Sequence, residues 1–306
     1  MQRAYLSKLM EIAEKNSNVL HLVADSGTGY DEMFQRNFPL QMFNFGIAEE
    51  HMVAAAAGMA TAGKIPFVYT AGAFLAYRSL EFIRDDICFQ NLNVKVVGMG
   101  SGLAWCSLGP SHHTTEDIAV LRAIPNLKIL SAATPFQAAA CVEEAYQHQG
   151  PVYIRIGMNN EKEYYNDDYH LTMSGQDVML EGEDITIFTT GSILEEVMSA
   201  ADMLRGLGIS AAVVNVAIVK PFDEEELLKR FEKSRLLVTV EEHNVQGGLG
   251  GILSEVMSKY GVGKRLMRIG LNDVFAEGYS NNQKTLRKQN HLDAESIVKN
   301  IIEVFQ

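Results

Sequence analysis

Short apolar runs alternate along the whole chain with longer segments in which apolar residues recur at helical spacing. The runs that predict strands occupy residues 19–24, 65–70, 94–99, 127–130, 152–156, 185–189, 211–216, 236–240 and 266–269. Helical segments are expected at residues 3–15, 49–60, 74–90, 115–123, 135–147, 193–206, 223–233, 249–259 and 293–305. The apolar runs are continuous rather than alternating, as is typical of strands covered by helices on both faces. The pattern therefore predicts an α/β fold with two doubly wound domains and mostly parallel sheets.

A polar segment separates the two halves of this pattern. It begins near Met158, is rich in Asn, Glu, Asp and Tyr, and continues without a clear period to about Asp184. We interpret it as a linker, which gives domains at residues 1–158 and 184–306 joined by residues 159–183.

The composition excludes several classes of function. With 306 residues, of which 47% are hydrophobic and 21% charged, the chain is long enough for two domains with their own cores. Its formal net charge of -12 offers no basic surface for nucleic acid or for an anionic membrane. The cysteines form no close pair, and no apolar segment has the length of a membrane span or of a signal-peptide core. We expect a cytoplasmic protein that binds neither nucleic acid nor membrane.

Two acidic residues open a helix that otherwise consists almost entirely of small apolar residues. Glu49 and Glu50 precede a run that includes five alanines and Gly58. A helix without a polar face is usually buried, and small residues allow another backbone to approach closely. One of these carboxylates is therefore a candidate for catalysis in a cleft or an interface. The alternative is that both are ordinary first-turn acids that complement the helix dipole.

Three loops follow predicted strands at the edge of the sheet where α/β proteins bind ligands. The first is the glycine-containing turn at residues 25–29, and the second carries Phe74, which could be a ligand platform or simply part of the core. The third, residues 100–117, is unusually long and contains His112 and His113 in a loop rich in Gly, Pro and Ser. A zinc site is a competing interpretation of the two histidines, although no acidic or Cys partner has a metal-ligand spacing.

Two of these segments resemble signature motifs of the transketolases and their relatives. Residues 46–51, GIAEEH, resemble the G-I-A-E-Q-H or G-I-R-E-H motif, and residues 109–113, GPSHH, resemble the end of the G-E-D-G-P-T-H-Q loop. The match continues through residues 116–126, 151–155 and 240–250 in the same order and covers essentially the whole chain.

The resemblance implies that the chain is the C-terminal subunit of a split transketolase, with a pyrimidine-binding domain followed by a transketolase C-terminal domain. The cofactor would be thiamine diphosphate with Mg²⁺. The family's G-D-G motif and distal N-N pair, which hold magnesium and diphosphate, have no counterpart here. We therefore expect the metal to be held mainly by a separate N-terminal subunit, no metal ligand in this chain and no activity without that subunit. An α2β2 heterotetramer, with self-association of this chain, is the expected assembly.

The resemblance also assigns roles to individual residues around the cofactor. Glu49 matches the glutamate that hydrogen-bonds a ring nitrogen of the aminopyrimidine, and His112 matches a histidine that hydrogen-bonds substrate oxygens. Both are expected to be catalytic. Phe74 best matches the ring that stacks on the pyrimidine, with Tyr77 as the alternative, and Asp25 matches an aspartate near the cofactor.

The expected substrate site combines matches with departures from the family pattern. Arg3 and Arg155 match arginines that clamp a sugar phosphate, and His113 stands where Gln is usual and could also contact substrate. Leu108 replaces the aspartate that binds the hydroxyl beside the acceptor's aldehyde. Because an apolar side chain would leave a buried hydroxyl unpaired, Leu108 favours a branched, deoxy or otherwise atypical acceptor.

The expected reaction is the transfer of a two-carbon ketol unit from a ketose, expected to be phosphorylated, to an aldehyde. Alternatives are a beta subunit of a 2-oxo acid dehydrogenase-like enzyme and a non-catalytic partner of a complete transketolase. Deoxyxylulose-phosphate synthase shares G-I-A-E-Q-H but normally carries its diphosphate domain on the same chain. The acidic pair Glu241 and Glu242, with His243, is expected to serve the fold and the interface rather than catalysis.

Overall fold

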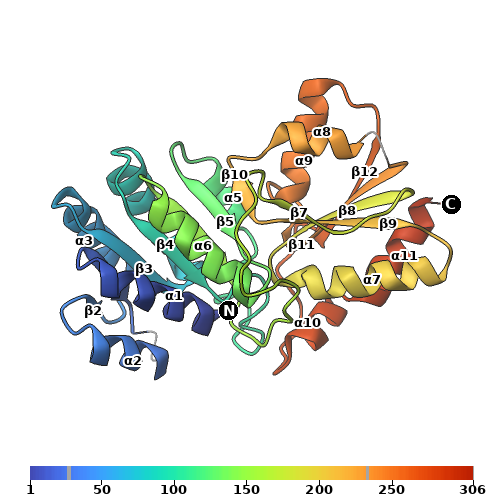
Figure 1. Ribbon diagram of the computed structural model, residues 1–306. Coiled ribbons are helices and arrows are strands. Elements are labelled where there is room, and N and C mark those ends of the chain that lie inside the picture. Colours follow the sequence, from blue (N-terminus) through green and yellow to red (C-terminus); the bar gives the residue numbers. More distant parts are fainter. Residues whose placement is uncertain (26–28, 232–233, 306) are drawn as a thin grey trace.

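The computed structural model describes residues 1–25, 29–231 and 234–305 (Figure 1). Two sheets with flanking helices form two domains that lie side by side, with the N-terminus near their junction and the C-terminus at the far end of the second domain (Figure 1). Within these ranges, no helix is both long and apolar enough to cross a membrane.

The first domain is built on a seven-stranded sheet with the order β10-β5-β6-β4-β3-β1-β2. Its strands are β1 (Val19–Val23), β2 (Met42–Asn44), β3 (Ile65–Ala71), β4 (Lys95–Met99), β5 (Lys128–Ser131), β6 (Val152–Ile156) and β10 (Ile218–Lys220). Its helices are α1 (Gln2–Lys15), α2 (Gly29–Asn37), α3 (Glu49–Thr61), η1 (Phe74–Arg78), α4 (Leu80–Phe82), η2 (Ile83–Cys88), α5 (Asp117–Arg122) and α6 (Pro135–Gln147). Among the strands that the structure describes in this sheet, all pairings are parallel except that of β10 with β5.

The second domain has a five-stranded sheet with the order β12-β11-β8-β9-β7. Its strands are β7 (Gln176–Leu180), β8 (Ile185–Thr190), β9 (Ala211–Val216), β11 (Leu236–Asn244) and β12 (Arg265–Leu271). Its helices are η3 (Gly191–Ile193), α7 (Leu194–Gly206), α8 (Glu224–Phe231), α9 (Leu249–Tyr260), α10 (Gln283–Gln289) and α11 (Ala294–Phe305). Among the described strands of this sheet, only β7 pairs in the antiparallel direction, at the edge beside β9.

The predicted fold class, two doubly wound domains with mostly parallel sheets, is confirmed. Two strands differ from the expected organisation. β7 lies within the segment interpreted as a linker, so the second sheet starts at Gln176 rather than near residue 184. β10 follows β9 in the chain but pairs with β5 of the first sheet, with Ile218 opposite Leu130. The second half of the chain thus completes the sheet of the first half.

The helix expected at residues 74–90 is divided into two π-helical segments, η1 and η2, around the single turn α4. At the end of η1, the Ser79 amide donates to the Phe74 carbonyl at 3.2 Å, which is the five-residue step of a π-helix. The wider turn shifts the faces on which later side chains lie. This segment follows β3 and therefore borders the ligand-binding edge of the first sheet.

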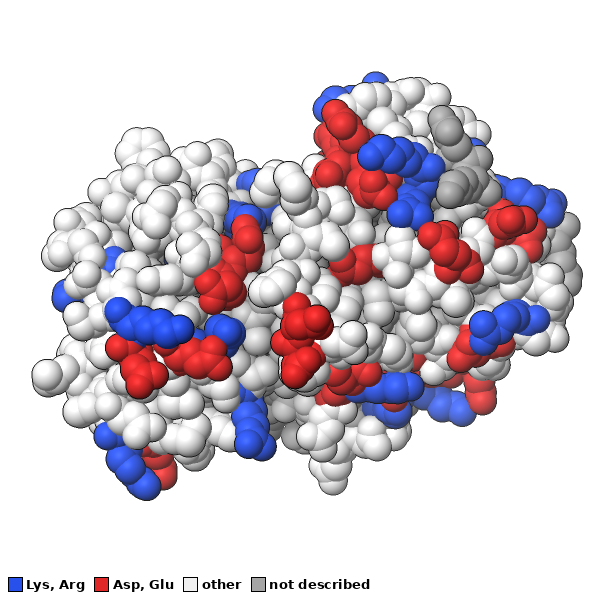
Figure 2. Space-filling model, viewed as in Figure 1, with Lys and Arg blue, Asp and Glu red and all other residues white. Residues whose placement is uncertain are grey.

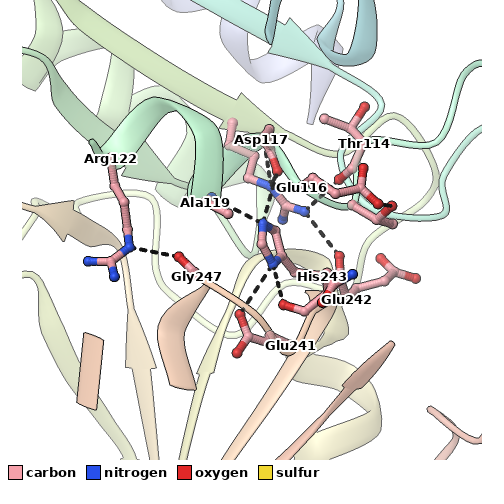
Figure 3. Close-up of polar contacts among 12 residues, drawn as sticks. Thr114, Glu116, Asp117, Ala119, Arg122, Glu241, Glu242, His243 and Gly247 are labelled. Atoms are coloured by element: carbon pink, nitrogen blue, oxygen red, sulfur yellow. Dashed lines mark hydrogen bonds and ion pairs between the residues drawn. The ribbon is translucent and has the colours of Figure 1, made fainter. Parts of the chain in front are cut away.

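Buried charges connect the two domains (Figure 3). The Arg155 guanidinium, on β6, donates to the Asp117 carboxylate at 2.9 Å and to the Glu242 carbonyl of β11 at 3.1 Å. The Glu242 carboxylate in turn accepts from Arg287 of α10 at 2.9 Å and from Gln283 at 3.0 and 3.1 Å. Because these groups are almost completely buried, each charge depends on its partner for compensation.

Removing the Glu242 charge should therefore destabilise the protein strongly. We expect Glu242→Gln to leave the buried Arg287 with only the longer 3.8 Å contact to Glu196 and to lower the free energy of unfolding by about 3 kcal/mol. Urea denaturation followed by circular dichroism measures the change. Lys284→Gln is the matched control, because its ion pair with Glu195 is exposed and should contribute no more than about 1 kcal/mol. Equal effects of the two substitutions would contradict the assigned role of Glu242.

Candidate functional site

The candidate site lies where strands of the first sheet end. Phe74 follows β3, the loop with His112 follows β4, and Asp25 follows β1. Glu49 begins α3, which comes after β2. Because the carboxyl ends of parallel strands share one edge of the sheet, these segments converge there.

A buried carboxylate stands at the centre of this group. The Glu49 side chain is 2% exposed, and its Oε2 accepts a hydrogen bond from Nη1 of Arg78 at 2.7 Å. The guanidinium of Arg78 also lies over the Phe74 ring, 4.6 Å from its centroid. On the same ring, His112 makes an edge contact with a centroid distance of 5.0 Å. The structure thus brings Glu49, Phe74 and His112 together and adds Arg78, which the sequence analysis missed.

The helix that carries Glu49 is only partly covered by its own chain. Met52, Val53 and Ala56 are buried against the first sheet, as the small apolar sequence predicts. Gly58 is exposed, and a Cβ placed there would meet nothing within 4 Å. The outer surface of α3 is therefore open to close approach by another backbone.

Tyr77, the alternative stacking residue, is held by a different partner. Its hydroxyl donates to Oε2 of Glu116 at 2.8 Å and accepts from the Glu116 amide at 2.9 Å. Burial raises the pKa of Tyr77 well above its usual value, so the hydroxyl stays protonated and can donate this bond. Tyr77 thereby ties η1 to the histidine loop, whereas Phe74 lies beside the Glu49 ion pair.

The histidine loop is closed by backbone hydrogen bonds between Gly102 and Thr114, at 2.9 and 3.0 Å. Within it, the amides of His112 and His113 both donate to the Gly109 carbonyl, and Gly109 has a positive φ of 74°. Glycine adopts this conformation without strain, which explains its position before the turn. The loop therefore holds both histidines at fixed positions after β4.

The two histidines differ in exposure. His112 is half-buried, with Nδ1 at 3.0 Å from Oγ of Ser111, and burial lowers its pKa, so the neutral ring is favoured near neutral pH. His113 is 2% exposed, and burial lowers its pKa too, against the opposing charges of Glu242 and Glu116. A substrate contact by His113 would need the loop to open. Across the residues that the structure describes, no three metal-ligating side chains cluster, so the zinc interpretation gains no support.

Three further predicted site residues are exposed. Leu108 is 46% exposed in the histidine loop, and Arg3 is exposed near the start of α1. Asp25 is exposed with a positive φ of 48°, and its amide donates to Oδ1 of Asn44. The remainder of its turn, residues 26–28, lies outside the described residues.

The prediction for Arg155 is contradicted by its position. The residue is 1% exposed, and its guanidinium donates to Asp117, to the Thr114 carbonyl and to the Glu242 carbonyl. A group that is buried and engaged in this way cannot clamp a sugar phosphate. Its side chain lies on the face of β6 that meets the second domain, whereas the prediction required a face open to substrate.

The second domain approaches the histidine loop through its own buried polar residues (Figure 3). Glu241 accepts from the amides of Leu249 and Gly250 at 2.7 and 2.8 Å and so caps the start of α9. His243 accepts from the Ala119 amide of α5 at 3.3 Å. These contacts agree with the structural role expected for the acidic pair and His243.

Arg78 is the one member of the central group that the sequence analysis did not single out. A signal for it was present in the sequence, because it is a cation four residues after Phe74. Helical side chains at that spacing lie close enough to meet.

Comparisons with known proteins identify both domains. Residues 1–162 match the family described as transketolase, pyrimidine binding domain, and residues 176–297 match transketolase, C-terminal domain. The chain is 38% identical to a putative transketolase C-terminal section from Methanocaldococcus jannaschii, covering 99% of this chain and 95% of the relative. It is 34% identical to one of the subunits of an apulose-4-phosphate transketolase from Actinobacillus succinogenes, covering 96% and 94%.

A solved structure is similar over the same length. It is described as a split gene transketolase in an inactive beta4 tetramer, and it superposes with a TM-score of 0.89 at 35% identity. The match covers 99% of this chain and 97% of that one. The agreement in length extends the likeness to both domains and to their arrangement.

The burial of His113 makes a pH-dependent prediction. Because its pKa is below the usual 6.5 in the folded chain, protonation favours the unfolded chain, and stability is lost as pH falls below about 6.5. We expect His113→Gln to lose less stability than the wild type between about pH 7.5 and about pH 5.5, as measured by urea denaturation at each pH. Exposed His170 provides the control, and His170→Gln should keep the wild-type pH dependence. Identical losses for wild type and His113→Gln would disprove the effect.

Proposed function

The chain belongs to the transketolase family, and we propose that it is the C-terminal subunit of a split transketolase. The reaction is the transfer of a two-carbon ketol unit from a phosphorylated ketose to an aldehyde. The observation that carries this proposal is the buried Glu49 carboxylate beside Phe74, at the ligand-binding edge of a pyrimidine-binding domain.

The residues of this edge fit half of thiamine diphosphate. Glu49 offers a buried carboxylate to a pyrimidine nitrogen, and Phe74 offers a ring on which a flat heterocycle can stack. Asp25, after β1, completes the proposed surface of this chain toward the cofactor. When bound, the cofactor supplies the electron sink for cleavage of the carbon–carbon bond.

Glu49 provides the polar contact with the cofactor, and His112 provides the polar contact with the substrate. A carboxylate shielded from water forms stronger hydrogen bonds than an exposed one, so Glu49 can hold or transfer a proton at a pyrimidine nitrogen. His112 keeps a neutral ring near neutral pH, because burial lowers its pKa, and can donate or accept a hydrogen bond at a substrate oxygen. Arg3 is the remaining candidate for the substrate phosphate.

An N-terminal subunit would supply the diphosphate and Mg²⁺ site. Support comes from two relatives, one named as a C-terminal section and the other as one subunit of a transketolase, and from a split gene transketolase described as an inactive beta4 tetramer. On the face shown in Figure 2, few charged side chains lie over α3. Gly58 of α3 and Phe89, which is 84% exposed, are uncharged surface positions suited to a protein interface. We infer an α2β2 assembly.

The substrate class follows from two positions and one relative. Arg3 provides an exposed cation for a phosphate group, while Leu108 in the histidine loop cannot pair with a hydroxyl. The relative from A. succinogenes is named for apulose 4-phosphate. These observations favour an acceptor that differs from the ordinary hydroxyaldehydes beside its reacting carbon.

Replacement of Glu49 tests the proposed function directly. We expect Glu49→Gln to lower turnover about 100-fold or more in a complex with a cognate N-terminal subunit, thiamine diphosphate and Mg²⁺. Ketose phosphate consumption with an aldehyde acceptor measures turnover, and circular dichroism confirms that the variant folds. Glu50→Gln is the matched control, because Glu50 is the neighbouring carboxylate without an assigned role.

Three outcomes would contradict the proposal in different ways. Full activity of Glu49→Gln would remove the assignment of the carboxylate. Release of carbon dioxide from a 2-oxo acid by the wild-type complex would favour a dehydrogenase-like subunit. Formation of a complex without any ketol transfer would favour a non-catalytic partner.

Replacement of Leu108 tests the acceptor class. Because an aspartate can pair with a hydroxyl that leucine leaves unpaired, we expect Leu108→Asp to raise kcat/KM for an ordinary α-hydroxyaldehyde phosphate about tenfold. Steady-state kinetics with ribose 5-phosphate and with a 2-deoxy analogue measure the preference. The deoxy analogue is the control, since its kcat/KM should not rise. If the ratio of kcat/KM for ribose 5-phosphate to kcat/KM for the deoxy analogue does not change, Leu108 is excluded as a determinant of acceptor choice.

A further inference from the structure

Arg78 makes the two contacts that the proposed function assigns to the pyrimidine of the cofactor. Arg78 donates a hydrogen bond to Glu49 at 2.7 Å, and its guanidinium lies over the Phe74 ring at 4.6 Å. A stacked aminopyrimidine would likewise place a flat group over Phe74 and a ring nitrogen against the Glu49 carboxylate. The guanidinium is also flat, with donors in its plane, so it can satisfy the same two partners.

We propose that Arg78 is a gating residue that occupies the pyrimidine position in the free subunit and is displaced when thiamine diphosphate binds. This inference rests on the proposed function, because it assumes that Glu49 and Phe74 receive the pyrimidine. The inference adds Arg78, which competes with the cofactor, to Glu49 and Phe74, which are proposed to bind it. Binding of the cofactor then includes the cost of breaking the ion pair between Arg78 and Glu49.

The surroundings of Arg78 allow it to leave. Its side chain is 42% exposed, so it can move from Glu49 into water, whereas the Glu49 side chain is 2% exposed and fixed at the start of α3. Glu49 is its hydrogen-bond partner in the described residues, and no other acidic group is joined to it there. Phe74 and Arg78 lie at the two ends of the π-helical segment η1, and π-helical turns commonly occur at functional sites.

The competing interpretation is that Arg78 is a structural partner which stays in place and helps hold the cofactor. The two interpretations predict opposite signs for the loss of its charge. A structural partner would support Glu49 and Phe74, and its removal would weaken cofactor binding. A gating residue competes with the cofactor, and its removal strengthens binding.

Titration calorimetry of thiamine diphosphate with Mg²⁺ into the reconstituted complex distinguishes these signs. We expect Arg78→Gln to lower the Kd of thiamine diphosphate about tenfold, because the ion pair no longer has to be broken. Arg84→Gln is the matched control. Arg84 is an exposed arginine in the next π-helical segment, η2, where it pairs with Asp85, and its loss should leave the Kd unchanged.

A second variant guards against a folding defect. Arg78→Lys keeps a cation near Glu49 but removes the flat group over Phe74, so we expect a smaller decrease in Kd than for Arg78→Gln. Circular dichroism and thermal unfolding confirm the fold of each variant. If the Kd of thiamine diphosphate is unchanged or higher in folded Arg78→Gln or Arg78→Lys, Arg78 is not a gating residue. If the gating role fails in this way, the proposed function still holds, provided that the wild-type complex binds thiamine diphosphate and that Glu49→Gln loses turnover. Absence of binding by the wild-type complex overturns both.

Discussion

The guanidinium of Arg155 is the point on which the arrangement of the two domains depends. It lies on β6 in the first sheet, and within its reach are the Asp117 carboxylate, the end of the histidine loop at Thr114 and the backbone of β11 at Glu242. A buried guanidinium is costly unless its donors are paired, so the three segments are constrained to meet around it. The position of the histidine loop is therefore set partly by a strand of the other domain.

This constraint gives the second domain a role in positioning the site. Glu242 lies between Arg155 and Arg287 and thus links the first sheet to α10. His243 bonds the backbone of α5, directly after the histidine loop. β10 extends the first sheet from the same half of the chain. Because the contacts of Glu242 with Arg155, of His243 with Ala119 and of β10 with β5 cross the domain junction, a change in the second domain can move His112 without altering any residue near it.

The sequence was sufficient to predict the fold class and the placement of Phe74 and His112 at one edge of the sheet, because these follow from continuous apolar strands and from the loops after them. Glu49 was added to this group only by the resemblance to the transketolases. It was insufficient where a shift of one residue along a strand changes the face of the sheet on which a side chain lies. Arg155 lies in a strand buried on both sides, and a neighbouring position would have faced the opposite side of the sheet. The contact between Arg78 and Glu49 joins residues 29 positions apart in the chain, so no local spacing predicts it. β7 and β10 are short edge strands whose pairing depends on segments distant in the chain.

The burial of Glu49 before any partner arrives is itself a physical problem. A carboxylate with 2% exposure requires a hydrogen-bond donor or a cation, since water is excluded from it. In the proposed site between subunits, the partner of that carboxylate would be the pyrimidine of the cofactor. The free chain therefore needs a substitute that is good enough to stabilise the carboxylate and exposed enough to be released. Arg78, anchored by a ring face and one hydrogen bond, meets both requirements, and the same surface can then serve the folded free subunit and the assembled enzyme.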